Sequence, residues 1–314
     1  MSPMNAADEA SALAYAELAP EQIIAALEEY GHRCDGRFLA LNSYENRVYQ
    51  VGIEDAEPVV AKFYRPGRWT DAQILEEHGF AQELADAEIP VVAPLDFDGE
   101  TLLRSGSFRF SVYERRGGRA PELDDFALQK QIGRFIARIH LIGETREFST
   151  RPAIDVDSYG MRSVDYLLDE QVIPLELEDA YESVASQVLE GIDACLSRAG
   201  DSNLFRIHAD FHPGNVLIAA DQVHIVDLDD ARIGPAVQDI WMFLSGDQQE
   251  QEPQLAALLE GYEDFRTFDA RELHLIEALR SLRIMHYAAW LARRWDDPAF
   301  KTAFPWFAGQ RYRD

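Results

Sequence analysis

The sequence predicts an α+β protein of two lobes, an N-terminal antiparallel sheet with one main helix and a larger, mostly helical C-terminal lobe. Runs rich in β-branched and aromatic residues dominate the chain as far as residue 113, whereas apolar residues at helical spacing dominate after residue 125. Between these halves, residues 114–119 form a charged linker that contains Gly117 and Gly118. We therefore expect the N-terminal lobe at residues 20–116 and the C-terminal lobe at residues 117–314.

The composition is that of a globular protein with a strongly acidic surface. Of the 314 residues, 47% are hydrophobic and 27% are charged, and the formal net charge is −27. Such a surface repels nucleic acid and anionic membranes, so neither is an expected partner. Two cysteines are too few for a disulfide framework in a chain of this size. The N-terminus lacks the basic region of a signal or transit peptide, and no apolar run approaches about 20 residues, so we expect a cytoplasmic protein.

In the N-terminal half, prolines, glycines and polar turns separate strands from two helices. Residues 1–19 are expected to form a mobile tail. Pro20 opens the first helix and Gly31 ends it. Strands are predicted at residues 37–41, 47–51, 59–64, 91–97, 101–104 and 108–113, and the second helix at residues 71–85.

The C-terminal half reads as helices around one hairpin. Two short apolar runs, residues 216–219 and 223–226, flank a polar turn and predict the hairpin. Helices are predicted at residues 125–142, 159–168, 177–196, 235–243, 254–262 and 271–295.

The stretch 206–230 concentrates chemistry-bearing side chains around this hairpin. Asn215 and Asp227 would lie near each other at the open end of the hairpin, with Asp210 in the preceding loop. Two carboxylates and one amide oxygen that converge at a strand end are what a hard cation and a phosphate substrate need. Asp229 and Asp230 follow closely, and they are either second-cation ligands or substrate-side acids.

Simpler explanations exist for each of these residues. Asp, Asn and Gly are ordinary turn residues. A metal hydrolase is another alternative, because His208, Asp210 and His212 loosely resemble a His/Asp metal site. The sequence has no further cluster of His or Cys ligands, which disfavours that alternative. We expect His208 to support the loop by hydrogen bonding. Asp239 either braces the loop or is a carboxylate at a helix N-terminus that faces the helix dipole.

Lys62 is the single charged residue in the apolar strand at residues 59–64. Because an unpaired buried ammonium is costly, Lys62 needs a partner, and the second helix offers Glu76, Glu77 and Glu83. A Lys–Glu pair that presents the ammonium to ATP phosphates is one explanation. A lysine that snorkels to solvent at a sheet edge is the other, and the strand alone favours neither.

The polar residues 42–46 join the first two predicted strands. The Ser43 hydroxyl and the backbone N–H groups of this segment could contact phosphate oxygens. The segment contains no glycine, so glycine flexibility cannot be its device. Taken alone, it is more typical of a simple hairpin turn.

Together, His208, Asp210 and Asn215, followed by Asp227 twelve residues later, resemble the catalytic and metal-binding loops of the aminoglycoside phosphotransferase and choline kinase branch of the protein-kinase-like fold. The resemblance implies a two-lobed kinase-like fold that uses ATP and Mg²⁺. It also implies that Glu77 is the helix glutamate that pairs with Lys62. The hinge would then lie near Tyr113–Arg115, where the backbone would hydrogen-bond adenine.

Longer motifs extend the resemblance over nearly the whole chain, from about Pro20 to Trp306. They resemble bacterial serine/threonine protein kinases of this fold that act in stress response; the motifs are LNSYENRVYQ, VAKFYRP-x-RWT, QILEEH, VDLDDAR-x-GPAVQD-x-W and RRW-x-DPAF. The resemblance implies a monomeric, ATP- and Mg²⁺-dependent enzyme that phosphorylates Ser or Thr hydroxyls of proteins, including its own. It assigns catalysis to Asp210 and Asp227, metal binding to Asn215 and Asp227, and an ATP-site role to Ser43.

Two alternative functions are compatible with the same residues. One is a small-molecule hydroxyl kinase of the aminoglycoside, choline or homoserine type, because residues 206–230 would handle ATP and a hydroxyl in either case. The other is a nucleotide-binding regulator without catalysis. The presence of Asp210, Asn215 and Asp227 together disfavours the regulator.

Overall fold

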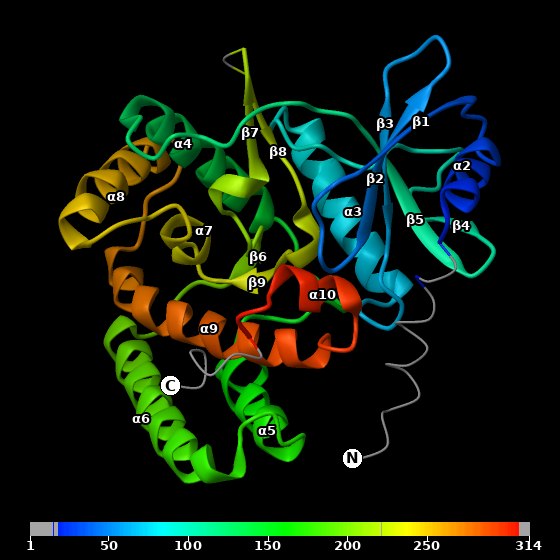
Figure 1. The fold of residues 1–314 in the computed structure, drawn as a ribbon. Helices are drawn as coiled ribbons and strands as arrows, with labels where there is room; N and C mark the ends of the chain where they lie inside the picture. Colours follow the sequence, from blue (N-terminus) through cyan, green and yellow to red (C-terminus); the bar gives the residue numbers. More distant parts are fainter. Residues whose placement is uncertain (1–14, 16–17, 221, 308–314) are drawn as a thin grey trace.

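The computed structural model describes residue 15, residues 18–220 and residues 222–307 (Figure 1). The predicted tail at residues 1–19 lies mostly outside the described residues, and so does Asp221 in the turn of the predicted hairpin. The first lobe is built on a five-stranded antiparallel sheet in the order β1-β2-β3-β5-β4. Its strands are β1 (Cys34–Ala40), β2 (Arg47–Ile53), β3 (Val59–Phe63), β4 (Leu103–Ser105) and β5 (Phe108–Glu114).

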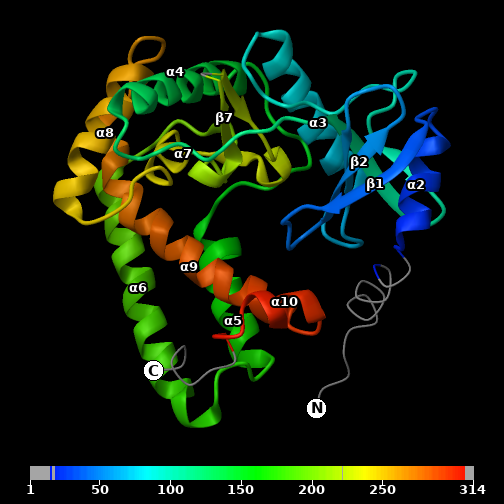
Figure 2. The same cartoon turned by 45° about the horizontal axis from the view of Figure 1, so that its top comes forward.

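Two helices cover this sheet, and they belong to different cores. Helix α2 (Pro20–Glu28) begins at Pro20 as predicted, and it buries Ile23 and Leu27 against the sheet. Helix α3 (Asp71–Asp86) lies between the sheet and the second lobe (Figure 2). It is opened by a capping box between Thr70 and Gln73. Its buried face packs with the second lobe, so the two lobes share one hydrophobic core.

The predicted strand at residues 91–97 is wrong. This segment makes only isolated bridges, from Val91 to Ile225 in the second lobe, from Pro94 to Tyr113 in the sheet and from Phe97 to Glu100 in the following turn. Pro90 and Pro94 have no N–H groups to donate, so a continuous ladder cannot form along the segment. The segment therefore runs between the lobes and touches both.

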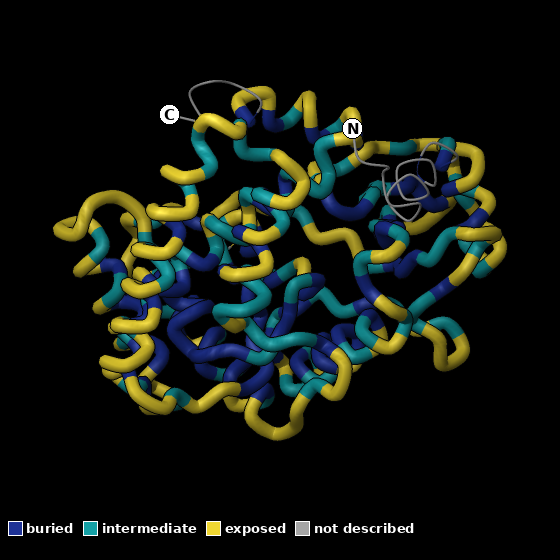
Figure 3. The backbone as a smooth tube through the Cα atoms, turned by 90° about the horizontal axis from the view of Figure 1, so that it is seen from below, coloured by how far each residue is buried: buried dark blue, intermediate teal, exposed yellow. Residues whose placement is uncertain are grey.

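The second lobe contains the predicted hairpin, β7 (Val216–Ala219) and β8 (Gln222–Ile225), and a short pair, β6 (Phe205–Ile207) and β9 (Arg232–Gly234). Helices surround them, and buried backbone fills the interior while exposed turns lie outside (Figure 3). The helices are α4 (Phe126–Gly143), α5 (Arg162–Asp169), α6 (Glu178–Ala199), α7 (Val237–Trp241), α8 (Gln248–Tyr262), α9 (Ile276–Arg293) and α10 (Pro298–Ala303). None of the described helices has both the length and the apolar content needed to span a bilayer.

Helices α4 and α8 pack closely because each carries a glycine at the contact. A Cβ atom on Gly133 would stand 2.0 Å from the Leu258 carbonyl oxygen, and one on Gly261 would stand 1.8 Å from the Lys130 carbonyl oxygen. Only glycine leaves room for such an approach. This packing brings Tyr262 on α8 into contact with His140 on α4, which in turn contacts Asp239 on α7.

Two predicted helix boundaries were displaced by capping residues. Helix α8 begins six residues before its predicted start at residue 254, because Asp247 accepts hydrogen bonds from the N–H groups of Gln249 and Glu250. Helix α9 begins at Ile276 instead of residue 271. A 3₁₀ turn, Ala270–Leu275, precedes it, and Asp269 caps that turn.

Candidate active site

One buried carboxylate holds the loop between β6 and β7 in place. Asp239 on α7 accepts hydrogen bonds from the N–H groups of His208 (2.9 Å) and Ala209 (2.8 Å), and its Oδ2 lies 3.1 Å from Nε2 of His140. Ala209 has a φ of +67°, a strained value for a residue with a Cβ atom. Asp239 therefore braces the loop, as predicted, by fixing the two amides that flank the strain.

Asp210, Asn215 and Asp227 lie together, as the hairpin pattern predicts. The Asn215 side-chain amide donates to the carbonyl oxygen (2.9 Å) and to Oδ2 (3.3 Å) of Asp210. The Asn215 carbonyl accepts from the N–H of Val226 at 3.0 Å, which places Asn215 beside Asp227 at the open end of the hairpin. His208 also contacts this end of the hairpin, because its Nε2 lies 3.1 Å from the Val226 carbonyl oxygen.

Arg283 on α9 is part of this site, and the sequence did not indicate it. Its Nη2 lies 2.7 Å from Oδ1 of Asp210, while Nε2 of His212 lies 3.5 Å from Oδ2. Burial raises the pKa of Asp210, but the His212 hydrogen bond and the Arg283 guanidinium outweigh burial and hold the pKa below its ordinary value. Asp210 is thus kept as a carboxylate. In an amphipathic helix, one arginine among several gives no local signal of which loop it faces.

Asp227 presents its carboxylate outward from a left-handed backbone. Its φ is +62° and its side chain is 52% exposed. Aspartate tolerates this conformation better than most residues that carry a Cβ atom. One oxygen lies 3.1 Å from Nζ of Lys62, so the second lobe reaches the sheet at this point.

The predicted pair between Lys62 and Glu77 does not form. Lys62 instead contacts Asp227 (3.1 Å) and Asp229 (3.0 Å). Burial would lower the pKa of Lys62, but these two carboxylates raise it well above its ordinary value. The lysine is therefore buried as a cation, and its charge is matched from the second lobe rather than from α3.

Glu77 has no ion pair with Lys62, and Nε2 of His78 lies 3.9 Å from its Oε2. The side chain is buried, and Oε2 accepts no hydrogen bond. Burial raises the pKa of Glu77 to about 7, and Lys62 opposes that rise. Glu77 is therefore an electrostatic neighbour of Lys62, whose direct contacts are with Asp227 and Asp229.

Asp229 and Asp230 are paired with cations. Asp229 contacts Lys62 and Arg68 and accepts from the Asn46 amide at 3.2 Å. Asp230 contacts Arg68 at 2.7 Å. Burial raises the pKa of Asp229, but Arg68 and then Lys62 lower it to about 2. These contacts match the charges of both carboxylates, and they place Arg68 and Asn46 in the site, which the sequence did not.

The predicted adenine segment lies where β5 ends. The side chain of Tyr113 is directed to a buried cluster, with its hydroxyl 3.2 Å from that of Tyr64. Nε of Arg115 donates to the Gln50 side chain at 3.3 Å. Beyond it, Arg119 exchanges backbone hydrogen bonds with Ile218 on β7. The linker is therefore attached to the β7–β8 hairpin and is not a free surface turn.

Ser43 lies in the segment that joins β1 and β2, residues 42–46. Ser43 is partly exposed, whereas Glu45 and Asn46 of the same segment are buried, with 8% and 3% exposure. The segment is thus more than a simple hairpin turn, because two of its polar side chains are turned into the protein.

Asn215 and Asp227 fit a divalent cation. No group of three or more His, Cys, Asp or Glu side chains that could hold a metal ion occurs among the described residues. Mg²⁺, however, is commonly held by one or two protein oxygens together with substrate phosphates. The Asn215 amide nitrogen donates to Asp210, so its Oδ1 and the exposed Asp227 carboxylate are the protein oxygens that would hold the ion.

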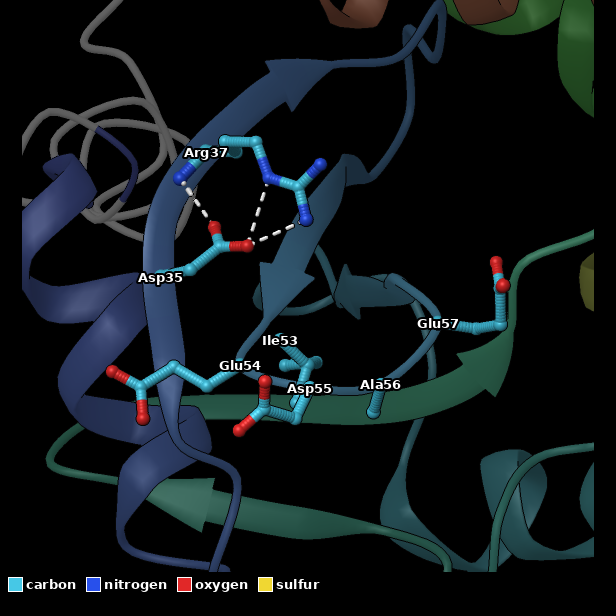
Figure 4. A pocket seen from close by; sticks show the side chains of 7 residues that line it. All are labelled: Asp35, Arg37, Ile53, Glu54, Asp55, Ala56 and Glu57. Carbon is cyan, nitrogen blue, oxygen red and sulfur yellow. Dashed lines mark hydrogen bonds and ion pairs between the residues drawn. The ribbon is translucent and has the colours of Figure 1, made fainter.

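A hollow on the far side of the sheet is separate from this site. It is lined by residues of β1 and of the turn after β2, and these are Asp35, Arg37, Ile53, Glu54, Asp55, Ala56 and Glu57 (Figure 4). Asp35 accepts hydrogen bonds from the backbone N–H and from Nε of Arg37, each at 2.8 Å. None of the predicted site residues lies there.

Comparison with known proteins establishes the family. The model of the phosphotransferase enzyme family matches residues 37–276, a range that includes Lys62, Asp210, Asn215 and Asp227. The chain belongs to this family. It is therefore a phosphotransferase, and the two-lobed kinase-like fold predicted from the sequence is confirmed.

Relatives within the phosphotransferase family are similar over almost their full length. Stress response kinase A of Escherichia coli (strain K12) is 45% identical over 302 residues, which is 96% of this chain and 91% of the relative. A serine/threonine protein kinase, RdoA, of Salmonella typhimurium is 43% identical with the same coverage. The predicted resemblance to bacterial stress-response kinases is confirmed.

Solved phosphotransferase structures share the fold at low sequence identity. Amicoumacin kinase hAmiN, in complex with AMP-PNP, Ca²⁺ and Ami, superposes with a TM-score of 0.74 at 19% identity, over 94% of this chain and 93% of that one. A microcompartment-associated aminopropanol kinase gives 0.67 at 18% identity, over 91% and 94% of the two chains. At these identities the likeness concerns the fold alone.

Proposed function

We propose that the chain is an ATP- and Mg²⁺-dependent serine/threonine protein kinase of stress response that also phosphorylates itself. The observation that carries the proposal is the position of Asn215, which donates to Asp210 with its side chain and lies beside Asp227. In the proposed site, Asp210 would orient the acceptor hydroxyl, and Asn215 and Asp227 would supply the oxygens that hold the metal. The 45% identity with stress response kinase A, over nearly the whole chain, supports a protein acceptor.

In the proposed reaction, the acceptor hydroxyl oxygen forms a bond to the γ-phosphorus of ATP as the bond from that phosphorus to the β,γ-bridging oxygen breaks. ADP leaves with the electron pair of the broken bond. Asp210 orients the hydroxyl and receives its proton. The low pKa of Asp210 keeps this carboxylate ionised and able to accept a hydrogen bond from the hydroxyl.

Several residues would position the nucleotide. Lys62 would meet the α- and β-phosphates, Ser43 would lie at the ATP site, and the backbone of residues 113–115 would bind adenine. Asn215 and Asp227 would hold Mg²⁺, which when bound offsets the negative charge of the phosphate oxygens. Glu77 lies behind Lys62 and acts on it through charge rather than through a hydrogen bond.

The test is transfer of label from γ-labelled ATP with Mg²⁺ to the protein itself and to a generic protein substrate. Wild type is compared with Asp210→Ala, and the matched control is Asp193→Ala, which removes an exposed carboxylate from α6. We expect wild type and Asp193→Ala to label Ser or Thr residues, which mass spectrometry identifies, and Asp210→Ala to lose the labelling.

Two outcomes would contradict the proposal. If neither the protein nor a protein substrate is labelled while a small amino alcohol or aminoglycoside is phosphorylated rapidly, the chain is a small-molecule kinase. If ATP binds but no acceptor of either class is labelled, the chain is a nucleotide-binding regulator.

A further inference from the structure

The segment between β1 and β2, residues 42–46, is attached to the C-terminal lobe through a buried carboxylate. Oε1 of Glu45 accepts hydrogen bonds from Nε (3.0 Å) and Nη2 (2.9 Å) of Arg294, and Oε2 accepts one from Nε1 of Trp290. Both partners lie at the C-terminal end of α9. A carboxylate that is only 8% exposed needs such charge-assisted donors to offset its desolvation.

Arg65 fixes the backbone of the same segment. Its Nε donates to the Glu45 carbonyl at 2.9 Å, and its Nη2 donates to the Tyr44 carbonyl at 3.3 Å. The same Nη2 contacts Oδ2 of Asp297 at 2.9 Å, and Arg47 reaches that oxygen at 3.0 Å. Asp297 also caps α10. The carbonyl groups of the segment are therefore held by a side chain that is itself tied to the start of α10.

Aromatic packing completes the attachment. The ring of Tyr44 lies 4.8 Å from that of Phe304, between centroids. Phe300 packs 4.9 Å from Trp290. Tyr44 is the exposed member of this group, whereas Phe300 is fully buried. The tip of the β1–β2 segment thus rests on the apolar surface formed by α9 and α10.

We propose that Glu45 is a positioning residue for the nucleotide, through which residues 290–304 fix the shape of the segment that faces the ATP phosphates. The inference rests on the proposed function and adds a requirement for the C-terminal helices. A glycine-free segment cannot wrap a phosphate by backbone flexibility, so its useful conformation has to be set in advance. The contacts to Arg294, Trp290 and Arg65 supply that constraint from outside the sheet lobe.

The affinity for nucleotide should therefore depend on a carboxylate that does not touch it. Glu45→Gln keeps the size of the side chain and removes its charge. We expect this variant to raise the KM for ATP and the dissociation constant of a non-hydrolysable ATP analogue about tenfold, with kcat changed less than about threefold.

The matched control is Glu83→Gln, which breaks a different ion pair between the lobes. Glu83 on α3 contacts Nη2 of Arg206 on β6 at 2.7 Å. If inter-lobe ion pairs matter only for stability, both variants lower the unfolding temperature and neither changes the affinity for nucleotide. A rise in KM with Glu45→Gln, but not with Glu83→Gln, supports a positioning role.

A double-mutant cycle tests the route. Arg294→Met should weaken nucleotide binding as Glu45→Gln does, and the double variant should be no weaker than the worse single variant. Additive losses would show that Glu45 does not act through Arg294, and they would overturn the proposed route.

A readout without nucleotide separates failure of this inference from failure of the proposed function. Arg47 begins β2 and is held by Asp297, so loosening the segment should speed tryptic cleavage after Arg47. We expect mass spectrometry to show faster cleavage there in Glu45→Gln and Arg294→Met than in wild type or Glu83→Gln. Unchanged cleavage and unchanged nucleotide affinity in these two variants would overturn the inference, even if the enzyme is an active kinase. If wild type does not turn over ATP while cleavage after Arg47 is still faster in the two variants, only the proposed function is overturned.

Discussion

Asp227 and Asp229 stand two residues apart and both contact Lys62, at 3.1 and 3.0 Å, yet they lie in different environments. The side chain of Asp227 is 52% exposed, and that of Asp229 is 5% exposed. Asp229 belongs to a buried layer of matched charges with Lys62 and Arg68, which joins the lobes. Asp227 lies beside the buried Asn215 at the open end of the hairpin, where its own carboxylate reaches solvent. The comparison teaches that burial and pairing, rather than residue type, separate structural carboxylates from those available to a substrate.

The largest expected effect is on the rate of autophosphorylation, and it comes from a change at Asp227. Asp227→Asn keeps a residue that tolerates φ of +62° but removes the charge that we propose holds Mg²⁺. We expect the rate of autophosphorylation to fall about a thousandfold. The free energy of unfolding, measured in urea, should change by less than about 1 kcal/mol, because Lys62 retains Asp229. A large loss of stability without loss of rate would reverse the comparison.

The buried layer should respond in the opposite way. Asp229→Asn leaves Lys62 and Arg68 with one fewer carboxylate inside the protein. We expect the free energy of unfolding to fall by about 3 kcal/mol. Urea titration beside Asp227→Asn provides the measurement, and equal stabilities for the two variants would show that the layers are not distinct.

Glu77 lies buried near Lys62, and the pH dependence of stability tests its raised pKa. Its pKa is about 7 in the folded protein against an ordinary 4.5, so between these values the folded state holds a proton that the unfolded state has lost. This group's contribution to stability therefore falls as pH rises, by about 2 kcal/mol from pH 5 to pH 7. Glu77→Gln should lack that loss.

The quantity to compare is the difference in the free energy of unfolding between wild type and Glu77→Gln at each pH, because other titrating groups cancel in it. His78 is the neighbouring titratable group, and burial lowers its pKa to about 3, so it contributes a change of opposite sign to both proteins. Parallel stability curves for wild type and Glu77→Gln from pH 5 to pH 7 would contradict a raised pKa for Glu77.

The smallest effect is expected at Arg283, because its ion pair with Asp210 is partly exposed. Arg283→Gln removes the cation that helps to lower the pKa of Asp210, so the acidic limb of the pH–rate profile should move to higher pH. At neutral pH we expect the rate to fall about threefold. A rate loss as large as that of Asp227→Asn would place Arg283 in direct contact with the substrate.

Much of the fold could be read from local sequence. The hairpin of β7 and β8 follows from two apolar runs around a polar turn, and α3 follows from a capping box and an apolar face. The segment at residues 91–97 looked like a strand because it is apolar. Its prolines and its divided contacts to Ile225 and Tyr113 prevented a ladder.

The candidate site was only partly predictable. The proximity of Asp210, Asn215 and Asp227 follows from their spacing around one hairpin. Lys62 was expected to pair with Glu77, which lies near it along the chain, but it pairs with Asp227 and Asp229. Such a choice depends on how closely two lobes approach, and local sequence carries no information on that distance.

The sequence by itself determined the two-lobed class, the β7–β8 hairpin and the residue types of the candidate site, because these depend on periodicity, turn chemistry and short-range spacing. The tertiary structure alone decided which charges meet. Asp229 reaches Lys62 across 167 positions of the chain, Arg283 reaches Asp210, and Glu45 reaches Arg294. Ion pairs form wherever packing brings opposite charges within a few ångströms, and their members are set by the packing of the lobes rather than by their order in the chain.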